Sequence, residues 1–381
     1  MNDPRFLQEE GQGIFTGNEL LVKGGLEGRL GLLTGYPGSP VSEVFDAAGR
    51  VADLLVERGI LVQIANNEAL GAARLNGSQM APVRAMAVMK SVGAHVASDG
   101  LAIGNMAGTG PAGGVVAVFG DDTWSEGTQV PADSRFIAKH LYMPLLEPST
   151  FQEVKDWIGA AFDLSDSTGL YVAYLVTSNQ ADGGGTVVLG PNRFPDLTTN
   201  NPVEIDSRTI STEDRVVIPP LTSIKEDEVL SRRLPAFLEA VRARGLNRIL
   251  GDTPTARRPI GFVTSSLAYC YLEHALDMVG LAGRYPILKY GVTYPLDPEI
   301  LRTFSERVDE IYVVEEKRGF LEEQVTAALQ GLHQEGRVGP FRVWGKRFPN
   351  GWKGFPASRG LNPSIVLQTL ARIQKDQPGR W

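Results

Sequence analysis

The sequence predicts an α/β fold in two domains. Short apolar runs alternate with helical patterns along most of the chain, which is typical of strands connected by helices. Two runs, VRAMAVM at 83–89 and VVAVFG at 115–120, are continuously apolar, as expected for strands of a parallel sheet that helices cover on both faces. With 381 residues, the chain also exceeds the usual size of a single domain.

The first elements follow a turn rich in glycine and proline at residues 35–40. After this turn, apolar residues recur at the spacing of one helical face and so predict a helix. They are Val41, Val44, Phe45, Ala48, Ala52 and Leu55. LVQIA at 61–65 predicts a strand, and a helix is expected from Asn67.

The longest weakly charged stretch lies between Lys90 and Asp121, with Asp99 as its only formal charge. It holds eight glycines, which argues against a membrane span. We therefore expect a buried helix followed by the strand at 115–120.

A polar, turn-rich composition between about residues 180 and 257 marks a connector, with one predicted helix at 233–245. A second α/β domain follows, with strands predicted at 261–266, 286–291, 309–314 and 341–345. Its last helix is expected to begin with Asn362 as the N-cap and Pro363 at the first helical position. We set the limits at 1–205 for the first domain, 206–257 for the connector and 258–381 for the second domain.

Charge and cysteine content exclude several classes of function. A net charge of −7 and a pI near 5.3 favour neither nucleic acid nor an anionic membrane as a partner. Cys270 is the only cysteine, so the chain can form no internal disulfide and cannot supply the four thiolates of an iron–sulfur cluster. The polar, acidic start MNDPRFLQEE does not resemble a signal peptide, so we expect a cytoplasmic protein.

The stretch LLTGYPGSPVSEVF at 32–45 joins a predicted strand to a predicted helix. Ser39 is a candidate N-cap with Pro40 in the first turn, and Glu43 adds favourable charge near the helix start. Gly35 and Gly38 allow the backbone to approach a neighbour closely. These features fit a ligand-binding turn and a plain strand-to-helix turn equally well.

Glu68, in IANNEALGAARLNG, follows the strand predicted at 61–65. Parallel sheets bind ligands at the carboxyl ends of their strands, and small residues surround this glutamate in the sequence. The alternative is an ordinary glutamate in the first turn of a helix. Glu315, Glu316 and Cys270 in the second domain are best interpreted as a turn at the end of the sheet and a core thiol.

Seven segments, in order along nearly the whole chain, resemble one family. They are TGNELLVKGGLEGRLGLLTGYPGSPVSEVFD, NNEALGAARLNG, MKSVGAHVASDGL, FGDDTWSEGTQVPADSRFIAKHLYMPLLEPST, ILKYGVTYPL, IYVVEEKRGFLEEQV and LNPSIV. The family is the indolepyruvate-type, thiamine-diphosphate-dependent 2-oxoacid:ferredoxin (acceptor) oxidoreductases, and the matching part is the alpha subunit. The resemblance implies a pyrimidine-binding domain, with a parallel sheet and helices on both faces, followed by a transketolase-C-terminal-like α/β domain.

The resemblance also implies roles for two residues. Glu68 matches the family's glutamate that contacts the ring nitrogen of the cofactor's aminopyrimidine. Sharing a proton with that nitrogen favours the imino form, which takes the proton from the neighbouring thiazolium carbon. Ser39 matches a hydroxyl position that faces substrate and cofactor, in a turn whose other members are Tyr36, Pro37 and Gly38.

Further residues are implied near the substrate. Gln129, Asp133 and Arg135 match a polar segment of the family, and Asp99 lies in the Met-Lys segment; the alternative for these is hydrogen bonding at a domain interface. The chain departs from the family pattern at Ser91, His95 and Glu126, where His, Asn and His are expected. Because these departures lie where the substrate side chain is read, they argue against assigning indolepyruvate itself as the substrate. The resemblance implies a bulky or aryl 2-oxoacid, with indolepyruvate or phenylglyoxylate as examples. The absence of a matching arginine clamp argues against pyruvate.

Thiamine enzymes hold diphosphate and metal with a Gly-Asp-Gly and an asparagine about thirty residues later. Neither GDD at 120–122 nor GDT at 251–253 has that continuation. We therefore expect thiamine diphosphate to be shared with a diphosphate-binding subunit, and Mg²⁺ and iron–sulfur clusters to lie on partners. The implied partners are that subunit, a gamma-type subunit and a ferredoxin-like iron–sulfur subunit, with coenzyme A as co-substrate.

Two other functions remain open at this point. One is the beta chain of a thiamine-dependent 2-oxoacid dehydrogenase, which passes acyl groups to lipoyl carriers. The other is a non-catalytic scaffold subunit, since a fold does not dictate a function.

Overall fold

The computed structural model describes residues 2–201, 208, 216–251 and 257–376. The chain forms two compact units. The first comprises Met1–Leu146 and Phe151–Ala240, and the second comprises Glu147–Thr150 and Val241–Trp381. The domain limits of 1–205, 206–257 and 258–381 stay a prediction.

A parallel sheet forms the centre of the first unit, with the strand order β6-β7-β5-β4-β2-β3. Its strands are β2 (Leu30–Gly35), β3 (Leu61–Ile64), β4 (Arg84–Lys90), β5 (Gly114–Asp121), β6 (Leu145–Leu146) and β7 (Val172–Thr177). Every residue of β5 and β7 is buried, as a strand covered on both faces requires. The strands predicted at 61–65, 83–89 and 115–120 are confirmed.

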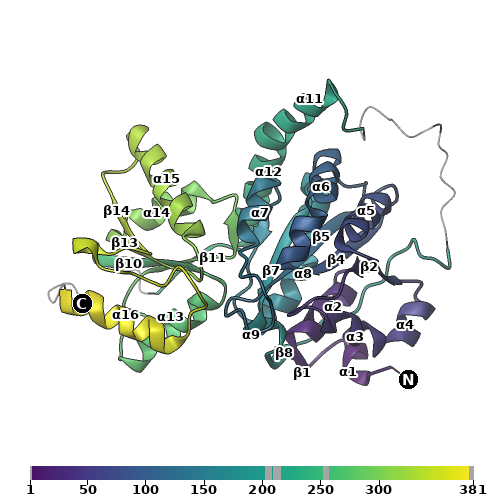
Figure 1. The fold of residues 1–381 in the computed structure, drawn as a ribbon, viewed down its shortest axis with the longest axis horizontal. Helices are drawn as coiled ribbons and strands as arrows, with labels where there is room; N and C mark the ends of the chain where they lie inside the picture. Colours follow the sequence, from purple (N-terminus) through teal and green to yellow (C-terminus); the bar gives the residue numbers. More distant parts are fainter. Residues whose placement is uncertain (1, 202–207, 209–215, 252–256, 377–381) are drawn as a thin grey trace. The chain divides into compact units, whose positions relative to one another are not determined.

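Helices cover both faces of this sheet (Figure 1). On one face, α2 packs against α8 and α3, and on the other face α5 packs against α6. The helices of the first unit up to β8 are α1 (Pro4–Leu7), α2 (Gly17–Glu27), α3 (Glu43–Gly49), α4 (Ala52–Glu57), α5 (Glu68–Ser78), α6 (Ser91–Ala107), α7 (Arg135–His140), α8 (Phe151–Thr168) and α9 (Ser178–Ala181). The helix expected before β5 is α6, but it is only half-buried, since His95, Val96, Asp99 and Ile103 are exposed. The helix expected from Asn67 is α5.

The prediction of one continuous helix along 41–55 was wrong, because the segment forms two helices, α3 and α4. It is interrupted between Gly49 and Ala52, where Val51 has φ −125° and ψ 25°. Val51 is itself buried whereas Ala52 is exposed, so the apolar face shifts by one residue at the break. The packing of Val51 thus decides the register of the second helix.

Two features of the first unit were not predicted. β1 (Gln12–Thr16) and β8 (Gly184–Val188) form a separate antiparallel pair. In the connector, α11 (Leu221–Glu228) and a π-helical turn (Val229–Arg233) precede α12 (Leu234–Arg244). α12 confirms the helix predicted at 233–245.

The second unit has a five-stranded sheet in the order β14-β13-β10-β11-β9. All pairs are parallel except β11 with β9. Its elements are β9 (Arg248–Leu250), β10 (Arg258–Ser265), α13 (Ser266–Met278), β11 (Ile287–Tyr290), β12 (Val292–Tyr294), α14 (Pro298–Ser305), β13 (Val308–Val314), α15 (Phe320–Gln334), β14 (Arg342–Trp344), a 3-10 turn (Pro349–Gly351) and α16 (Pro363–Asp376). The four strands predicted here are confirmed.

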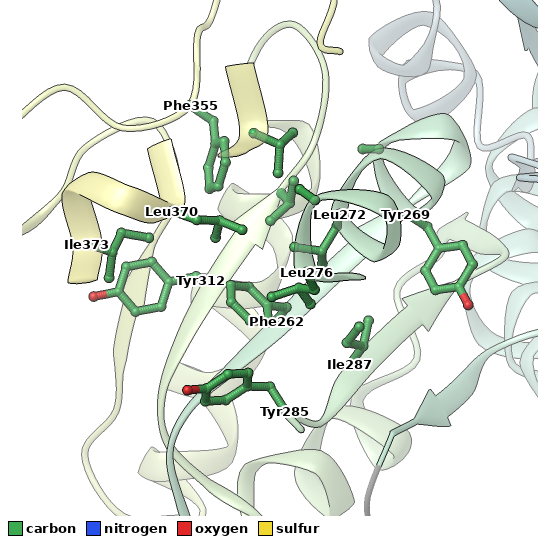
Figure 2. Packing of buried hydrophobic residues seen from close by; sticks show 14 of the residues in the cluster. Phe262, Tyr269, Leu272, Leu276, Tyr285, Ile287, Tyr312, Phe355, Leu370 and Ile373 are labelled. Carbon is green, nitrogen blue, oxygen red and sulfur yellow. The ribbon is translucent and has the colours of Figure 1, made fainter. Parts of the chain in front are cut away.

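Apolar clusters lie on both faces of this sheet. Figure 2 shows one of them, where Phe262 and Tyr312 from the strands meet Leu272 and Leu276 of α13. α14 and α15 pack on the other face. Burial of this kind contributes roughly 25 cal/mol per Å² of apolar surface removed from water, so both layers stabilise the unit.

Two helices of the second unit have side-chain caps, one of which was predicted. Asn362 caps α16, because its Oδ1 accepts the Ile365 N–H at 2.9 Å, as predicted. Glu315 accepts the N–H groups of Leu321 and Glu322 at 2.9 Å and so caps α15. This agrees with its interpretation as part of a turn at the end of the sheet.

Candidate functional site

The candidate site lies at the carboxyl ends of β2 and β4, which are neighbours in the sheet. After β2 the chain passes to α3, and after β4 it passes to α6. Because α3 belongs to the layer of α2 and α8 while α6 belongs to the layer of α5, the chain leaves these two strands toward opposite faces. In open α/β sheets ligands bind at such a point.

The turn after β2 is held by backbone contacts. Gly35 has φ +124°, and a Cβ there would lie 2.1 Å from the Val88 carbonyl oxygen, so only glycine fits. The next residue, Tyr36, donates its N–H to that carbonyl at 3.1 Å. A Cβ on Gly38 would lie 2.8 Å from Cδ of Lys90. The turn is therefore packed directly onto the end of β4.

Ser39 does not cap the following helix, so that prediction was wrong. The Val41 N–H donates to the Gly38 carbonyl at 2.9 Å and closes a turn over residues 38–41. Val41 is then buried against Gly120 of β5, and α3 begins only at Glu43. Pro40 consequently lies in the turn rather than in the first turn of the helix, whereas Glu43 does lie at the helix start.

Glu68 is the first residue of α5, and Asn67 caps the helix by accepting the Leu70 N–H at 2.9 Å. Its side chain is only 7 % exposed. The carboxylate lies against Gly93 of α6, where a Cβ would approach Oε1 to 2.4 Å. Within the described ranges, no residue forms a hydrogen bond or ion pair with this carboxylate.

α6 carries three of the candidate residues. Ser91 is its first residue and is buried, whereas His95 and Asp99 lie one and two turns later and are exposed. Since Gly93 contacts Glu68, the first turn of α6 adjoins the glutamate. Ser91 thus lies in the turn of α6 that contacts Glu68 through Gly93, whereas His95 and Asp99 occupy exposed positions further along the helix.

The loop after β5 reaches back to Ser39. Asp122 holds this loop, because its Oδ2 accepts the N–H groups of Gly127 and Thr128 at 2.7 and 3.0 Å. A Cβ on Gly127 would lie 2.8 Å from Oγ of Ser39. The loop and the turn therefore form one continuous wall.

Asp121 anchors the other end of the same loop. Its carboxylate accepts both the N–H and the hydroxyl of Ser134, at 2.9 and 2.5 Å. The pKa of Asp121 is raised to about 6, mainly by burial and also by the nearby Asp133, while the Ser134 hydrogen bonds and Arg135 oppose the shift. Neither Asp121 nor Ser134 was singled out from the sequence; the signal was the Asp-Asp pair directly after a buried strand.

The remaining candidates fall into two groups. Arg135 is buried, and its guanidinium forms a two-pronged ion pair with Asp133 at 2.7 and 2.8 Å. Glu126 and Gln129 lie exposed in the loop between Asp122 and this pair. The ion pair therefore closes the base of the loop, and the two exposed residues lie along its outer part.

One feature of this arrangement would suit a ligand with a ring nitrogen, such as an aminopyrimidine. A buried carboxylate without a protein partner, lodged where only glycine allows it room, is suited to hold a proton on a ligand nitrogen. Carboxylate, turn and loop wall all lie at the switch point of the sheet.

The described residues contain no group of three or more His, Cys, Asp or Glu side chains placed to hold a metal ion. Among the helices in the described ranges, none has the length and apolar character needed to cross a membrane.

Comparison with known proteins finds the same kind of relative by sequence and by family model. The family described as "Indolepyruvate oxidoreductase domain" matches residues 248–379. The indolepyruvate oxidoreductase subunit IorA of Pyrococcus horikoshii is 31% identical over 82% of this chain and 46% of its own length. IorA of Archaeoglobus fulgidus is 31% identical over 97% of this chain and 55% of its own length. The resemblance predicted from the sequence is confirmed, and the chain spans about half the length of these relatives.

Solved structures share the fold. A 2-oxoglutarate:ferredoxin oxidoreductase from Magnetococcus marinus, with 2-oxoglutarate, coenzyme A and succinyl-CoA bound, superimposes with a TM-score of 0.63 at 14% identity. That match covers 95% of this chain and 65% of the other. A split-gene transketolase matches with a TM-score of 0.53 at 12% identity, over 93% of this chain and 95% of the other. The predicted fold class, with thiamine-enzyme-type α/β domains, is confirmed.

Proposed function

Because this chain is related to the IorA subunits of indolepyruvate oxidoreductases, we propose that it is the pyrimidine-binding subunit of a thiamine-diphosphate-dependent 2-oxoacid:acceptor oxidoreductase. The observation that carries this proposal is Glu68, a buried carboxylate without a protein partner at the switch point of the sheet. The proposed reaction converts a 2-oxoacid and coenzyme A to an acyl-CoA and CO₂. Two electrons leave through iron–sulfur clusters on partner subunits to ferredoxin or another acceptor.

Glu68 and the turn after β2 would hold the pyrimidine end of the cofactor. When bound, thiamine diphosphate supplies the carbon nucleophile and electron sink that decarboxylation of a 2-oxoacid requires. The Glu68 carboxyl would hold a proton on the ring nitrogen of the aminopyrimidine. Tyr36, Pro37 and Gly38 would form the wall of the pocket, with the Ser39 hydroxyl facing the substrate.

Substrate selection is assigned to the neighbouring residues. Ser91 and His95 on α6, together with Glu126 and Gln129 on the loop, would meet the side chain of a bulky or aryl 2-oxoacid. Arg135 would act on the substrate through the loop, since its guanidinium is bound to Asp133. Mg²⁺, the diphosphate and the clusters would be held by the diphosphate-binding, gamma-type and iron–sulfur partners.

The decisive experiment compares two glutamate variants in the complex purified with its partners. Glu68→Gln is expected to lower turnover at least about 100-fold, the range expected for loss of a proton-transferring group. Glu43→Gln is the matched control, because Glu43 also begins a helix at this edge of the sheet but is exposed. It should retain full activity.

Other outcomes would favour the alternatives. Full turnover by the Glu68→Gln complex would contradict the proposal and favour a scaffold subunit. Transfer of acyl groups to a lipoyl carrier, in a complex without iron, would instead identify a 2-oxoacid dehydrogenase beta chain.

A further inference from the structure

Lys90 belongs to the candidate site by position, but the function proposed above gives it no role. It is the last residue of β4, which lies between β2 and β5 in the sheet (Figure 1). The next residue, Ser91, begins α6. Lys90 therefore lies at the same switch point of the sheet as the turn after β2.

The stem of Lys90 packs under the turn that carries Ser39. A Cβ on Gly38 would lie 2.8 Å from Cδ, 2.9 Å from Cγ and 3.0 Å from Cβ of Lys90. Glycine at position 38 thus leaves the room that this stem occupies. Because the ammonium is two bonds beyond Cδ, the side chain of Lys90 and the turn form one surface.

Lys90 and Glu68 border the edge of the sheet from its two faces. Side chains alternate along a strand, so Lys90 is on the same face of β4 as Arg84. Arg84 pairs with Asp163 of α8 at 2.7 Å, which identifies this face as the one covered by α2, α3 and α8. Glu68 begins α5, which packs with α6 on the other face.

The charge of Lys90 is not neutralised by a neighbouring side chain. The residue is half-buried, and in the ranges that the structure describes its ammonium forms no hydrogen bond or ion pair. The nearby loop carboxylates are engaged elsewhere, since Asp122 accepts amides of the loop and Asp133 pairs with Arg135. Withdrawing an ammonium from water without a partner costs free energy, so an anion bound beside Lys90 would be stabilised.

A 2-oxoacid would bring such an anion, because its carboxylate is bonded to the carbonyl carbon that reacts. Lys90 adjoins the turn whose Ser39 hydroxyl would face the substrate. The other cationic candidates are less suited to this carboxylate. Arg135 is already bound to Asp133, and His95 is exposed on α6.

A lysine also suits the chemistry of decarboxylation. It presents one compact charge, without the paired donors with which an arginine clamps both oxygens of a carboxylate. The carboxylate leaves as uncharged CO₂, so a contact with it stabilises the ground state more than the transition state. A single ammonium therefore opposes the reaction less than a two-point clamp would.

We propose that Lys90 binds the carboxylate of the 2-oxoacid substrate. This assignment rests on the function proposed for Glu68 and names the group that recognises the charged end of the substrate. It also provides a cation for that end in a chain without a matching arginine clamp.

The test compares Lys90→Met and Lys90→Arg in the complex purified with its partners. The substrate is phenylglyoxylate or indolepyruvate, whichever the unaltered complex oxidises faster. Methionine keeps an unbranched stem against Gly38 but removes the charge, so KM for the 2-oxoacid should rise at least about tenfold, with a smaller decrease in kcat. Lys90→Arg keeps the charge and should restore most of the affinity.

An uncharged probe separates recognition of charge from a structural effect. The methyl ester of the same 2-oxoacid has no carboxylate, so its inhibition constant should be equal in Lys90→Met and the unaltered complex. A purely structural role of Lys90 would weaken the acid and the ester alike. Lys139→Met is the matched control, because Lys139 is an exposed lysine on α7 of the same unit, and its KM should be unchanged.

A labelling experiment needs no variant. The 2-oxoacid should protect Lys90 of the unaltered complex from acetylation by acetic anhydride, measured by mass spectrometry, and should leave labelling of Lys139 unchanged. Equal labelling of Lys90 with and without the 2-oxoacid would overturn the assignment.

The kinetic results that would overturn it are equally specific. They are an unchanged KM in Lys90→Met, equal weakening of acid and ester, or a rise in the KM for coenzyme A alone. Glu68→Gln distinguishes the two proposals. If it abolishes turnover while Lys90→Met leaves KM unchanged, only the assignment of Lys90 fails, whereas full turnover by Glu68→Gln contradicts the proposed function at any KM of Lys90→Met.

Discussion

Gly93 controls the position of the carboxylate on which the proposed chemistry depends. A Cβ on this residue would come within 2.4 Å of Oε1 of Glu68 and 2.7 Å of its Cγ. Glycine inside a helix destabilises it by roughly 0.5–1 kcal/mol relative to alanine, so the fold alone would favour alanine here. The room left for Glu68 offers a functional reason for the glycine.

Gly93→Ala is therefore expected to separate activity from stability. The end of the Glu68 side chain can move aside, so the thermal midpoint should stay equal or rise, while turnover of the complex falls roughly 100-fold because the carboxylate is displaced. Gly77→Ala on α5 is the control, since a Cβ there meets nothing within 4 Å. Unchanged turnover in Gly93→Ala would show that the position of Glu68 is unimportant.

Asp121 gives a prediction for pH. Its native pKa of about 6 lies above the ordinary value of 3.8, so the folded chain binds this proton more tightly than the unfolded chain. The stability that it contributes is present below about pH 4 and is lost as the pH rises through about 6. A shift of about two units corresponds to at most roughly 3 kcal/mol.

Urea unfolding at pH 4 and pH 7 checks this prediction. Asp121→Asn should reduce the decrease in unfolding free energy between the two pH values, whereas Asp99→Asn, which alters an exposed carboxyl, should leave the decrease unchanged. Equal decreases in Asp121→Asn and the unaltered chain would show that Asp121 does not titrate in this range.

At the scale of elements, the loop from Asp122 to Ser134 is the feature that completes the site. It is held at both ends by carboxylates, and its middle contacts the Ser39 turn through Gly127. Asp122→Ala should free the amides of Gly127 and Thr128, so their hydrogen exchange should accelerate at least about tenfold. Asp46→Ala, in an exposed position on α3, should leave both amides protected. Unchanged exchange in Asp122→Ala would mean that other contacts hold the loop.

The sequence was most informative where one face or both faces of an element are buried. Continuous apolar runs identified β4 and β5, and Asn362 with Pro363 identified the start of α16. The start of α3 was missed, because packing of Val41 against Gly120 outweighs the capping tendency of Ser39. β8 was missed because its glycines carry no apolar pattern, and its pairing with β1 depends on residues far away in the sequence.

In the candidate site too, local sequence pattern predicted some features, and the packing of distant segments determined the others. The placement of Glu68 after a strand followed from local pattern, whereas its contact with Gly93 and the contact of Gly127 with Ser39 depend on the packing of separate elements. Arg135 was expected near the substrate, and its pairing with Asp133 two residues earlier emerges only from the fold.

At the scale of the whole molecule, the question is where the other half of the cofactor site lies. The chain matches about half the length of its IorA relatives, and neither GDD nor GDT is followed by the asparagine of a diphosphate site. A pyrimidine-binding surface alone leaves the diphosphate and its metal without ligands. We therefore expect activity to require a Gly-Asp-Gly segment with an asparagine about thirty residues later, supplied from outside these 381 residues by this polypeptide or by a partner.

Native purification tests this expectation directly. The complex is isolated without dissociation, every subunit is identified by mass spectrometry, and thiamine diphosphate and iron are assayed. A partner with the diphosphate segment, together with bound cofactor and iron, is the expected result, and removal of that partner should release the cofactor because Glu68 alone holds only its pyrimidine end. An intact native chain much heavier than 41.2 kDa would instead place both halves in one polypeptide. A chain of 41.2 kDa purified without partners, and with neither cofactor nor iron, would contradict the catalytic assignment. The carboxyl group of Glu68 would then have no cofactor nitrogen with which to share a proton.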